Sequence, residues 1–270
     1  MVQILLLLYT HFFVNCGTSS DKPLKKNTDS VIVQKAVVDT VSVIDSTKKY
    51  IYLTFDDGPQ PGTLECEKIC KDEHVKATFF IVGLHAMSNK DSKQIVKKLQ
   101  AQEPFFLIAN HSYTHAFRNK FYKFYQDPQG AFQDFIRCKD SLEFSNSFIR
   151  LPGNDSWSGG SLHAISKLTK AVVKKLDTAG YKIVGWDAEW RFKNGKIPIE
   201  TPEQLLNQVE YMLNKNHTKT KNHIVILSHD RMFHSKESQL KLIVFINGLK
   251  QHKEYVFQTI DKYPFTAVRN

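Results

Sequence analysis

The feature that most constrains the fold is a regular alternation of short apolar runs with helix-like stretches from Lys49 onward. Runs rich in β-branched and aromatic residues lie at 50–55, 77–83, 104–110, 147–152, 181–186, 223–228 and 254–260. Helix-like stretches lie between most of them, at 63–72, 91–102, 130–144, 161–179, 202–214 and 236–251. This order predicts an α/β fold with a largely parallel sheet. With seven units and no GxGxxG after the first strand, we expect a distorted (β/α)7-type barrel, closed or nearly closed, rather than a Rossmann-like open sheet.

Length and composition fit a single large domain. The chain has 270 residues, of which 41% are hydrophobic, and a formal net charge of +10. A basic surface favours anionic partners in general. The lysines are scattered, and the sequence has no zinc-finger or RNP-like pattern, so we expect no nucleic-acid partner. Nothing in the sequence predicts the oligomeric state.

The N-terminal segment has the pattern of an export signal. An apolar run at 4–14 is too short to span a bilayer, and Cys16 follows it at the start of a polar stretch. We expect residues 1–15 to be a lipoprotein-type signal and Cys16 to be acylated, which would attach an exported protein to a membrane. An ordinary cleaved signal with an incidental cysteine is the alternative. Residues 16–48 are expected to form a tether with an outlying strand at 31–45, and residues 49–270 the catalytic domain.

The cysteines do not predict a disulfide framework. The sequence has four, so lipidation of Cys16 would leave the odd number three: Cys66, Cys70 and Cys138. Cys66 and Cys70 share one expected helix, but a zinc site would need two further ligands at motif spacing. We therefore expect them to be small core residues.

Side chains capable of chemistry gather at the carboxyl ends of five expected strands. They are Asp56 and Asp57, His111 and His115, Arg150, Asp187 and Glu189, and His229 and Asp230. In parallel barrels these strand ends share one rim, where the loops build active sites. A series of ordinary solvated turns is the alternative, but histidine and arginine are not the usual turn formers. The sequence therefore predicts a site at this rim.

The spacing of His111 and His115 indicates a metal site. Residues four apart lie on one face of a helical turn, and a carboxylate from another strand would complete a catalytic, zinc-like set. The adjacent Asp56 and Asp57 are expected to point in different directions. One can then bind metal while the other faces the substrate.

Five motifs together resemble those of the polysaccharide deacetylases, carbohydrate esterase family 4. They are TFDDGP (54–59), HSYTH (111–115), RLPGN (150–154), WDAEW (186–190) and ILSHD (226–230), and the likeness covers about residues 49–260. The resemblance implies a distorted (β/α) barrel that removes N-acetyl or O-acetyl groups from glycans. It also implies one divalent metal, most often zinc, although cobalt and other ions can serve.

The roles of individual residues follow from this resemblance by position. It implies that Asp57, His111 and His115 bind the metal. It further implies that Asp56 is the general base, which Arg150 holds ionised, and that His229 is the general acid. A neighbouring carboxylate is expected to keep the pKa of His229 high.

The fourth motif departs from the family pattern. The family usually has Asp directly before Trp, whereas this chain has Glu189 before Trp190 and Asp187 two residues earlier. The sequence does not decide whether Asp187 or Glu189 raises the pKa of His229. Trp190 and Trp157 are candidates for packing against sugar or acetyl groups, with a place in the core as the alternative.

The sequence thus predicts an exported deacetylase of an acetylated cell-wall or extracellular glycan. One rival is an O-acetyl xylan or glycan esterase with the same site. A second is a catalytically inactive glycan-binding protein on the same fold, and a third is a lipid-anchored structural or adhesion protein. The presence of all the expected catalytic residues favours an enzyme.

Overall fold

The computed structural model describes residues 45 and 47–267, which belong to one compact unit. The predicted signal at 1–15 and Cys16 lie outside the described residues, as do nearly all of the outlying strand at 31–45 and of the tether at 16–48. The helices are α1 (Thr63–Asp72), α2 (Gly83–Ala86), α3 (Lys90–Gln100), α4 (His115–Asn119), α5 (Phe121–Gln126), α6 (Pro128–Leu142), α7 (Lys170–Thr178), α8 (Pro202–Asn214) and α9 (Lys236–Lys250), with 3-10 turns η1 (Asp230–Phe233) and η2 (Ile260–Lys262).

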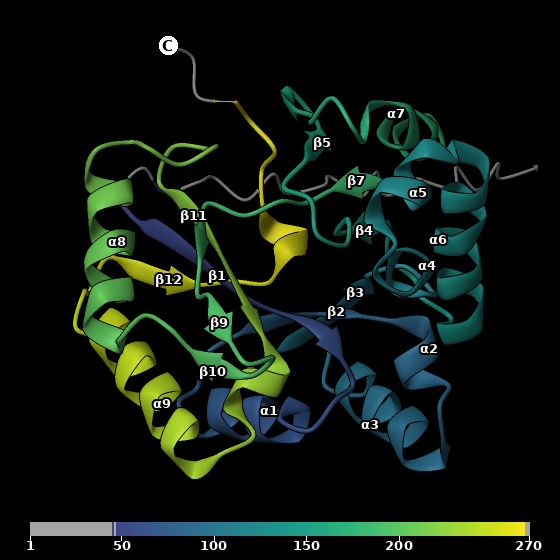
Figure 1. Cartoon of the computed structure of the whole chain (residues 1–270). Helices are drawn as coiled ribbons and strands as arrows, with labels where there is room; N and C mark the ends of the chain where they lie inside the picture. The colour runs from purple at the N-terminus through teal and green to yellow at the C-terminus, as the bar shows by residue number, and fades with distance from the viewer. Residues whose placement is uncertain (1–44, 46, 268–270) are drawn as a thin grey trace, which may run out of the picture. The chain divides into compact units, whose positions relative to one another are not determined.

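A curled, largely parallel sheet forms the centre of the molecule, with helices around it (Figure 1). Its strands are β1 (Lys49–Gly58), β2 (Ala77–Ile81), β3 (Phe106–Asn110), β4 (Phe148–Ile149), β5 (Trp157–Gly159), β6 (Leu162–Ala164), β7 (Lys182–Ile183), β8 (Ala188–Glu189), β11 (His223–His229) and β12 (Tyr255–Phe257). The order is β6-β5-β7-β4-β3-β2-β1-β11-β8, and β12 pairs with β1. A separate hairpin joins β9 (Phe192–Lys193) and β10 (Ile197–Pro198). The α/β barrel class is confirmed, but among the described strands β6 and β8 are the ends of the sheet, so the barrel is half open rather than closed.

The predicted pattern of strands and helices is largely confirmed. Each of the seven predicted runs contains a strand, and α1 and α8 have the predicted bounds. The exception is the stretch 161–179, where the predicted long helix is wrong. Its first part forms β6 and a turn, and only Lys170–Thr178 is helical. The short elements β5, β8, β9, β10, α2, α4 and α5 were not predicted, because segments of two to six residues carry too little periodicity to be detected.

Alternation along β1 separates two layers of core. Ile51, Leu53 and Phe55 point outward and pack with residues of the surrounding helices. Tyr52 points to the inside of the curled sheet, where it joins an inner core closed by Tyr263 of the C-terminal segment. Since Asp56 follows this inward series by alternation, the sequence directs it to the interior at the carboxyl end of the strand.

The buried cysteines are part of this core. Cys66, Cys70 and Cys138 are free and buried, as predicted for small core residues.

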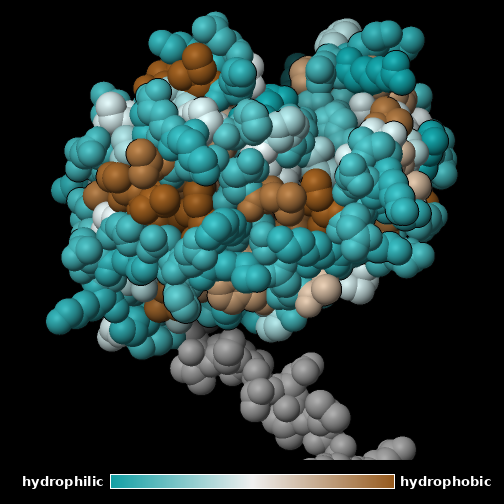
Figure 2. Space-filling view, turned by 90° about the horizontal axis from the view of Figure 1, so that it is seen from below, coloured by the Kyte–Doolittle hydropathy of each residue, from teal (hydrophilic) through white to brown (hydrophobic). Residues whose placement is uncertain are grey.

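The face that carries α1, α3 and α9, seen from below in Figure 2, is mainly hydrophilic, with apolar groups between the polar ones. No helix in the described part of the chain has the length and apolar character needed to cross a bilayer.

Acid is expected to weaken the fold through His223. This residue is 3% exposed at the start of β11, its Nδ1 shares a 2.9 Å hydrogen bond with Tyr52 Oη, and burial lowers its pKa to about 4. The unfolded chain therefore takes up a proton at a higher pH than the folded chain does, so stability is lost as the pH falls from 6.5 towards 4. Between about pH 7 and about pH 4.5 we expect the wild type to lose about 2 kcal/mol more unfolding free energy than His223→Gln, measured by urea denaturation. Equal losses in the two proteins would contradict this account.

Candidate active site

The end of β1 turns two adjacent carboxylates in different directions. The pairing of β1 with β2 shifts register between Asp56 and Gly58, and Asp57 has a positive φ of 75°. Such an irregularity at a strand end re-aims a side chain, and it is common beside active sites. Asp56 keeps the inward direction of the strand, whereas Asp57 turns towards the loop after β3.

The loop after β3 brings His111 and His115 together by a route that was not predicted. His111 follows the strand directly, and His115 opens α4, in which the residues have positive φ values from 50° to 65°. The two residues therefore do not lie on a regular α-helical turn as expected, although their rings still meet, with centroids 5.2 Å apart. The buried carboxylate of Asp134 holds this loop, because it accepts hydrogen bonds from the backbone N–H groups of Tyr113 and Thr114 and from the Thr114 hydroxyl.

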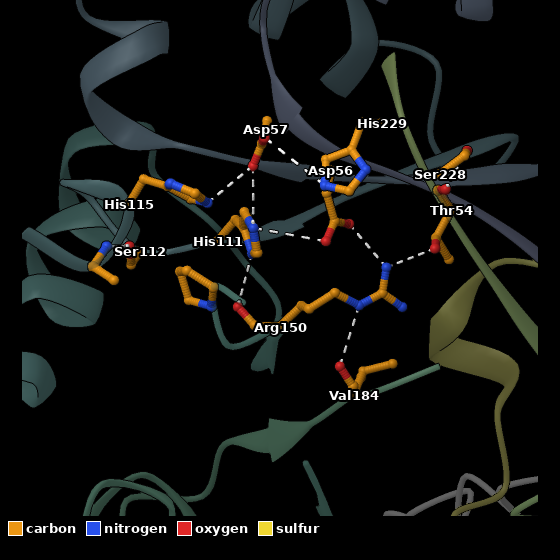
Figure 3. Close-up of polar contacts among 12 residues, drawn as sticks. Thr54, Asp56, Asp57, His111, Ser112, His115, Arg150, Val184, Ser228 and His229 are labelled. Atoms are coloured by element: carbon orange, nitrogen blue, oxygen red, sulfur yellow. Dashed lines mark hydrogen bonds and ion pairs between the residues drawn. The ribbon is translucent and has the colours of Figure 1, made fainter. Parts of the chain in front are cut away.

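Asp57 and the two histidines converge on a shared point. Asp57 Oδ1 lies 3.4 Å from His111 Nε2 and 3.1 Å from His115 Nε2 (Figure 3). His111 Nδ1 donates a hydrogen bond to the carbonyl oxygen of Arg150 at 2.9 Å, and His115 Nδ1 donates to Asn119 Oδ1. Protons on both Nδ1 atoms leave the Nε2 lone pairs facing Asp57, as in histidines that ligate a metal.

The cluster contains a buried oxygen acceptor that a cation could occupy. Asp57 Oδ1 is buried and has no hydrogen-bond donor among the described residues. Burial alone would raise the pKa of Asp57, but contacts with His111 and His115 hold it well below its ordinary value. Burial alone would lower the pKa of His115, yet contact with Asp57 raises it. Two imidazole nitrogens and one carboxylate are a ligand set that a divalent metal such as zinc accepts, so these residues fit the metal that the sequence predicted.

Asp56 is paired with a fully buried arginine. Arg150 Nη1 lies 2.8 Å from Asp56 Oδ1, as the sequence predicted for this pair, and also donates to Thr54 Oγ1 at 2.6 Å. Its other guanidinium nitrogens donate to the backbone carbonyls of Val184 and Gly185 at 3.3 and 2.8 Å. The free oxygen of Asp56 lies 3.6 Å from His111 Nε2, beside the metal-type cluster (Figure 3). This places a second carboxylate where it can accept a proton.

His229 lies on the far side of the cluster without the carboxylate partner that the sequence predicted. Its Nε2 is 3.9 Å from Asp57 Oδ2, while its Nδ1 is buried with no partner among the described residues. Burial lowers its pKa, and the opposing effects of Asp57 and Asp56 are smaller. The expectation that a neighbouring carboxylate keeps this pKa high is therefore wrong for this structure.

Of the three residues of the fourth motif that were predicted to contact His229 or the substrate, only Glu189 lines the site. Asp187 accepts backbone hydrogen bonds from Lys219 and Val225, so it organises the approach to β11 and does not contact His229. Trp190 is fully buried and donates from Nε1 to the carbonyl oxygen of Glu200, so its proposed place in a substrate pocket is wrong. Glu189 does line the site, as the other predicted carboxylate.

Trp157, the second candidate for contact with substrate, also belongs to the core. It is fully buried, and its ring centroid lies 5.2 Å from that of Tyr263.

Asp230, predicted at the rim, is fully buried and accepts a hydrogen bond from Thr63 Oγ1. Burial raises its pKa well above the ordinary value.

A cavity of about 550 Å³ opens over the predicted catalytic residues. Asp56, Asp57 and His229 line it, together with residues that sequence reasoning missed: Trp186, Phe192, Phe121 and Arg231. Arg231 Nη1 lies 3.1 Å from Asp57 Oδ2, and its guanidinium packs over the Phe192 ring. A lining that combines aromatic rings with carboxylate and imidazole groups suits a sugar ring that carries a small reactive group.

Known proteins with similar sequences are named as deacetylases. The polysaccharide deacetylase family model matches residues 44–142, which include both aspartates and both histidines. A putative polysaccharide deacetylase, YheN of Bacillus subtilis, is 27% identical over 220 residues, which are 79% of this chain and 67% of that protein. A peptidoglycan-N-acetylglucosamine deacetylase of Bacillus cereus is 29% identical over 214 residues, 78% of this chain and 69% of that protein.

Solved structures share the fold. The polysaccharide deacetylase Bc1974 of Bacillus cereus superposes with a TM-score of 0.58 at 24% identity, covering 80% of this chain and 94% of that one. The catalytic domain of a peptidoglycan N-acetylglucosamine deacetylase of Eubacterium rectale gives a TM-score of 0.59 at 24% identity, over 82% and 93% of the two chains. Residues 44–142 thus match the polysaccharide deacetylase family, and the described chain is similar to named deacetylases in sequence and shares the half-barrel fold of the solved ones.

Proposed function

We propose that this protein is a metal-dependent hydrolase that removes N-acetyl groups from a cell-wall or extracellular glycan and releases acetate. The observation that carries the proposal is the buried cluster of Asp57, His111 and His115 beside the Asp56–Arg150 pair, at the floor of one cavity. The names of the relatives support a glycan substrate, since one of them acts on peptidoglycan.

Asp57, His111 and His115 would hold the metal, with zinc favoured by the two imidazoles and one carboxylate. A divalent metal bound there would polarise the acetyl carbonyl and lower the pKa of water. The Arg150 carbonyl and Asn119 would keep both imidazoles in the tautomer that a ligand requires.

Asp56 is placed to act as general base. Arg150 holds one of its oxygens, which leaves the other free to take the proton from the attacking water. His229 lies opposite Asp56 in the register of β1 and β11, and it would deliver a proton to the departing amine nitrogen. Trp186 and Phe192 would pack against the sugar and shield the reacting bond from bulk water.

We also propose that the protein acts outside the cytoplasm, attached to a membrane by a lipid on Cys16. The apolar run at 4–14 and the polar stretch after Cys16 support this placement. Mass spectrometry of the membrane fraction should find an acylated N-terminal peptide that begins at Cys16.

Metal removal tests the proposed reaction. We expect incubation with a chelator to stop acetate release from N-acetylated glycan oligosaccharides, and added zinc or cobalt to restore it. His217→Gln is a suitable control, because this histidine packs against Tyr211 outside the site and its loss should not change metal content. Full activity in the presence of chelator would contradict the metal-dependent mechanism. Acetate release from acetyl xylan alone would favour the O-acetyl esterase hypothesis.

A further inference from the structure

A second cavity lies directly beside the proposed metal site. It has a volume of about 350 Å³ and shares Asp57, His115, Asn119 and Arg231 with the catalytic cavity. Because four residues line both cavities, the second one adjoins the catalytic cavity. Asp57 and His115, at the junction of the two cavities, are labelled in Figure 3.

The second cavity has an arginine in its lining, Arg118, that no carboxylate of the described residues pairs with. Arg118 and Arg231 both line it, and Asp57 is the one carboxylate among its described lining residues. The Asp57 carboxylate already contacts the two histidines and Arg231. The Arg118 side chain is exposed and has no ion pair within the described residues, and Arg231 Nε is buried without a hydrogen-bond acceptor. Arg118 therefore brings to this cavity a guanidinium whose donors have no carboxylate partner among the described residues.

The position of Arg118 is tied to that of a proposed metal ligand. Both belong to α4, the turn of positive φ that begins at His115, and Asn119 of the same turn holds the His115 ring. Arg231 directly follows Asp230 in η1, whose buried carboxylate accepts from Thr63 and anchors that turn. The two arginines thus belong to, or directly follow, elements that carry proposed catalytic residues.

We propose that this cavity is a subsite for an anionic substituent of the glycan, a carboxylate or a phosphate on the sugar next to the one that loses its acetyl group. Arg118 binds the anion, because a guanidinium pairs with a carboxylate or a phosphate through two parallel hydrogen bonds, and Arg231 adds positive charge to the same lining. Gln60 and Thr114, which also line the cavity, supply neutral polar contacts to the same sugar. The enzyme thereby prefers acidic N-acetylated glycans over neutral ones. This inference rests on the proposed deacetylase function.

The test compares three N-acetylated oligosaccharides of equal length: neutral, carboxylated and phosphorylated. With the metal-loaded full chain we expect kcat/KM for acetate release to favour an anionic substrate by about tenfold, and Arg118→Gln to bring that ratio close to one. Lys120→Gln removes a nearby exposed cation that does not line this cavity, so it should leave the ratio unchanged. The preference should also decline as the ionic strength rises. Whichever anionic substrate shows the preference identifies the group that is bound.

A binding measurement separates the subsite from the chemistry. In an Asp56→Asn background, calorimetric titration with the preferred anionic oligosaccharide should show affinity weakened about tenfold by Arg118→Gln. Equal rates on all three substrates, or a preference that survives Arg118→Gln, would overturn the subsite while leaving the deacetylase intact. Absence of acetate release from all three would overturn the proposed function, and the subsite with it.

Discussion

Replacing Asp56 by asparagine is expected to lower kcat for acetate release by about 10²–10⁴-fold while the protein still binds its metal. Asparagine keeps the shape of the side chain, and its amide oxygen can still accept the hydrogen bond that Arg150 Nη1 now donates at 2.8 Å. What it loses is the ability to take a proton from water. Because Asp57, His111 and His115 stay in place, metal content measured by elemental analysis should match that of the wild type.

Asp57→Asn is the matched control for this experiment. The two aspartates are neighbours and are both buried, yet Asp57 contacts both histidines while the nearest histidine nitrogen to Asp56 lies 3.6 Å away. We expect Asp57→Asn to lose both metal and activity, in contrast to Asp56→Asn. If Asp56→Asn lost its metal as well, or kept more than about a tenth of the wild-type kcat, Asp56 would not be a separate general base.

The layout of the fold was predictable because its longer elements repeat one pattern. Runs of five to ten residues, such as β1 and β11, have enough β-branched and aromatic residues to stand out, and helix caps at Thr201 and Ser235 mark where α8 and α9 begin. Closure of the barrel was not predictable in the same way. Whether the last strands meet depends on two-residue strands such as β8, whose pairing is set by tertiary packing rather than by local sequence.

The candidate site was predictable where strand ends supply its residues, and not where side-chain direction depends on packing. Parallel strands put Asp56, His111 and His229 on one rim whatever the details of the loops. Which tryptophan faces the cavity could not be read from the fourth motif, because a two-residue strand has no measurable alternation. Trp186 lines the cavity, while Trp190 packs between Phe233 and Phe245.

Two further features of the site depend on partners distant in the sequence. The left-handed turn at His115 contains no glycine to mark it, and the preceding loop is held by Asp134 of α6. Arg231 follows the fifth motif as an ordinary charged residue, and only the structure brings it within 3.1 Å of Asp57. The sequence therefore showed neither the conformation of the turn nor the contact of Arg231 with Asp57.

Arg150→Met is expected to give the largest loss of stability, about 3–5 kcal/mol, because it leaves Asp56 as a buried charge without its partner. Arg150 is fully buried and donates hydrogen bonds to four acceptors: Thr54, Asp56, Val184 and Gly185. Burial lowers the pKa of Arg150, an effect that the neighbouring Asp56 opposes. The unfolding free energy from urea denaturation measures the loss.

The double variant Arg150→Met/Asp56→Asn separates the charge from the packing. It removes both members of the pair, so it should recover part of the stability that Arg150→Met loses but none of the activity. Arg150→Lys retains a charge but cannot reach four acceptors with one ammonium group, so we expect an intermediate stability and a kcat at least about tenfold below wild type, because Asp56 is no longer fixed. A double variant no more stable than Arg150→Met would mean that the lost hydrogen bonds to Val184 and Gly185, rather than the unpaired Asp56 carboxylate, make the arginine essential. The arginine would then be a structural support of the strands, and the orientation of the base would have to come from another residue.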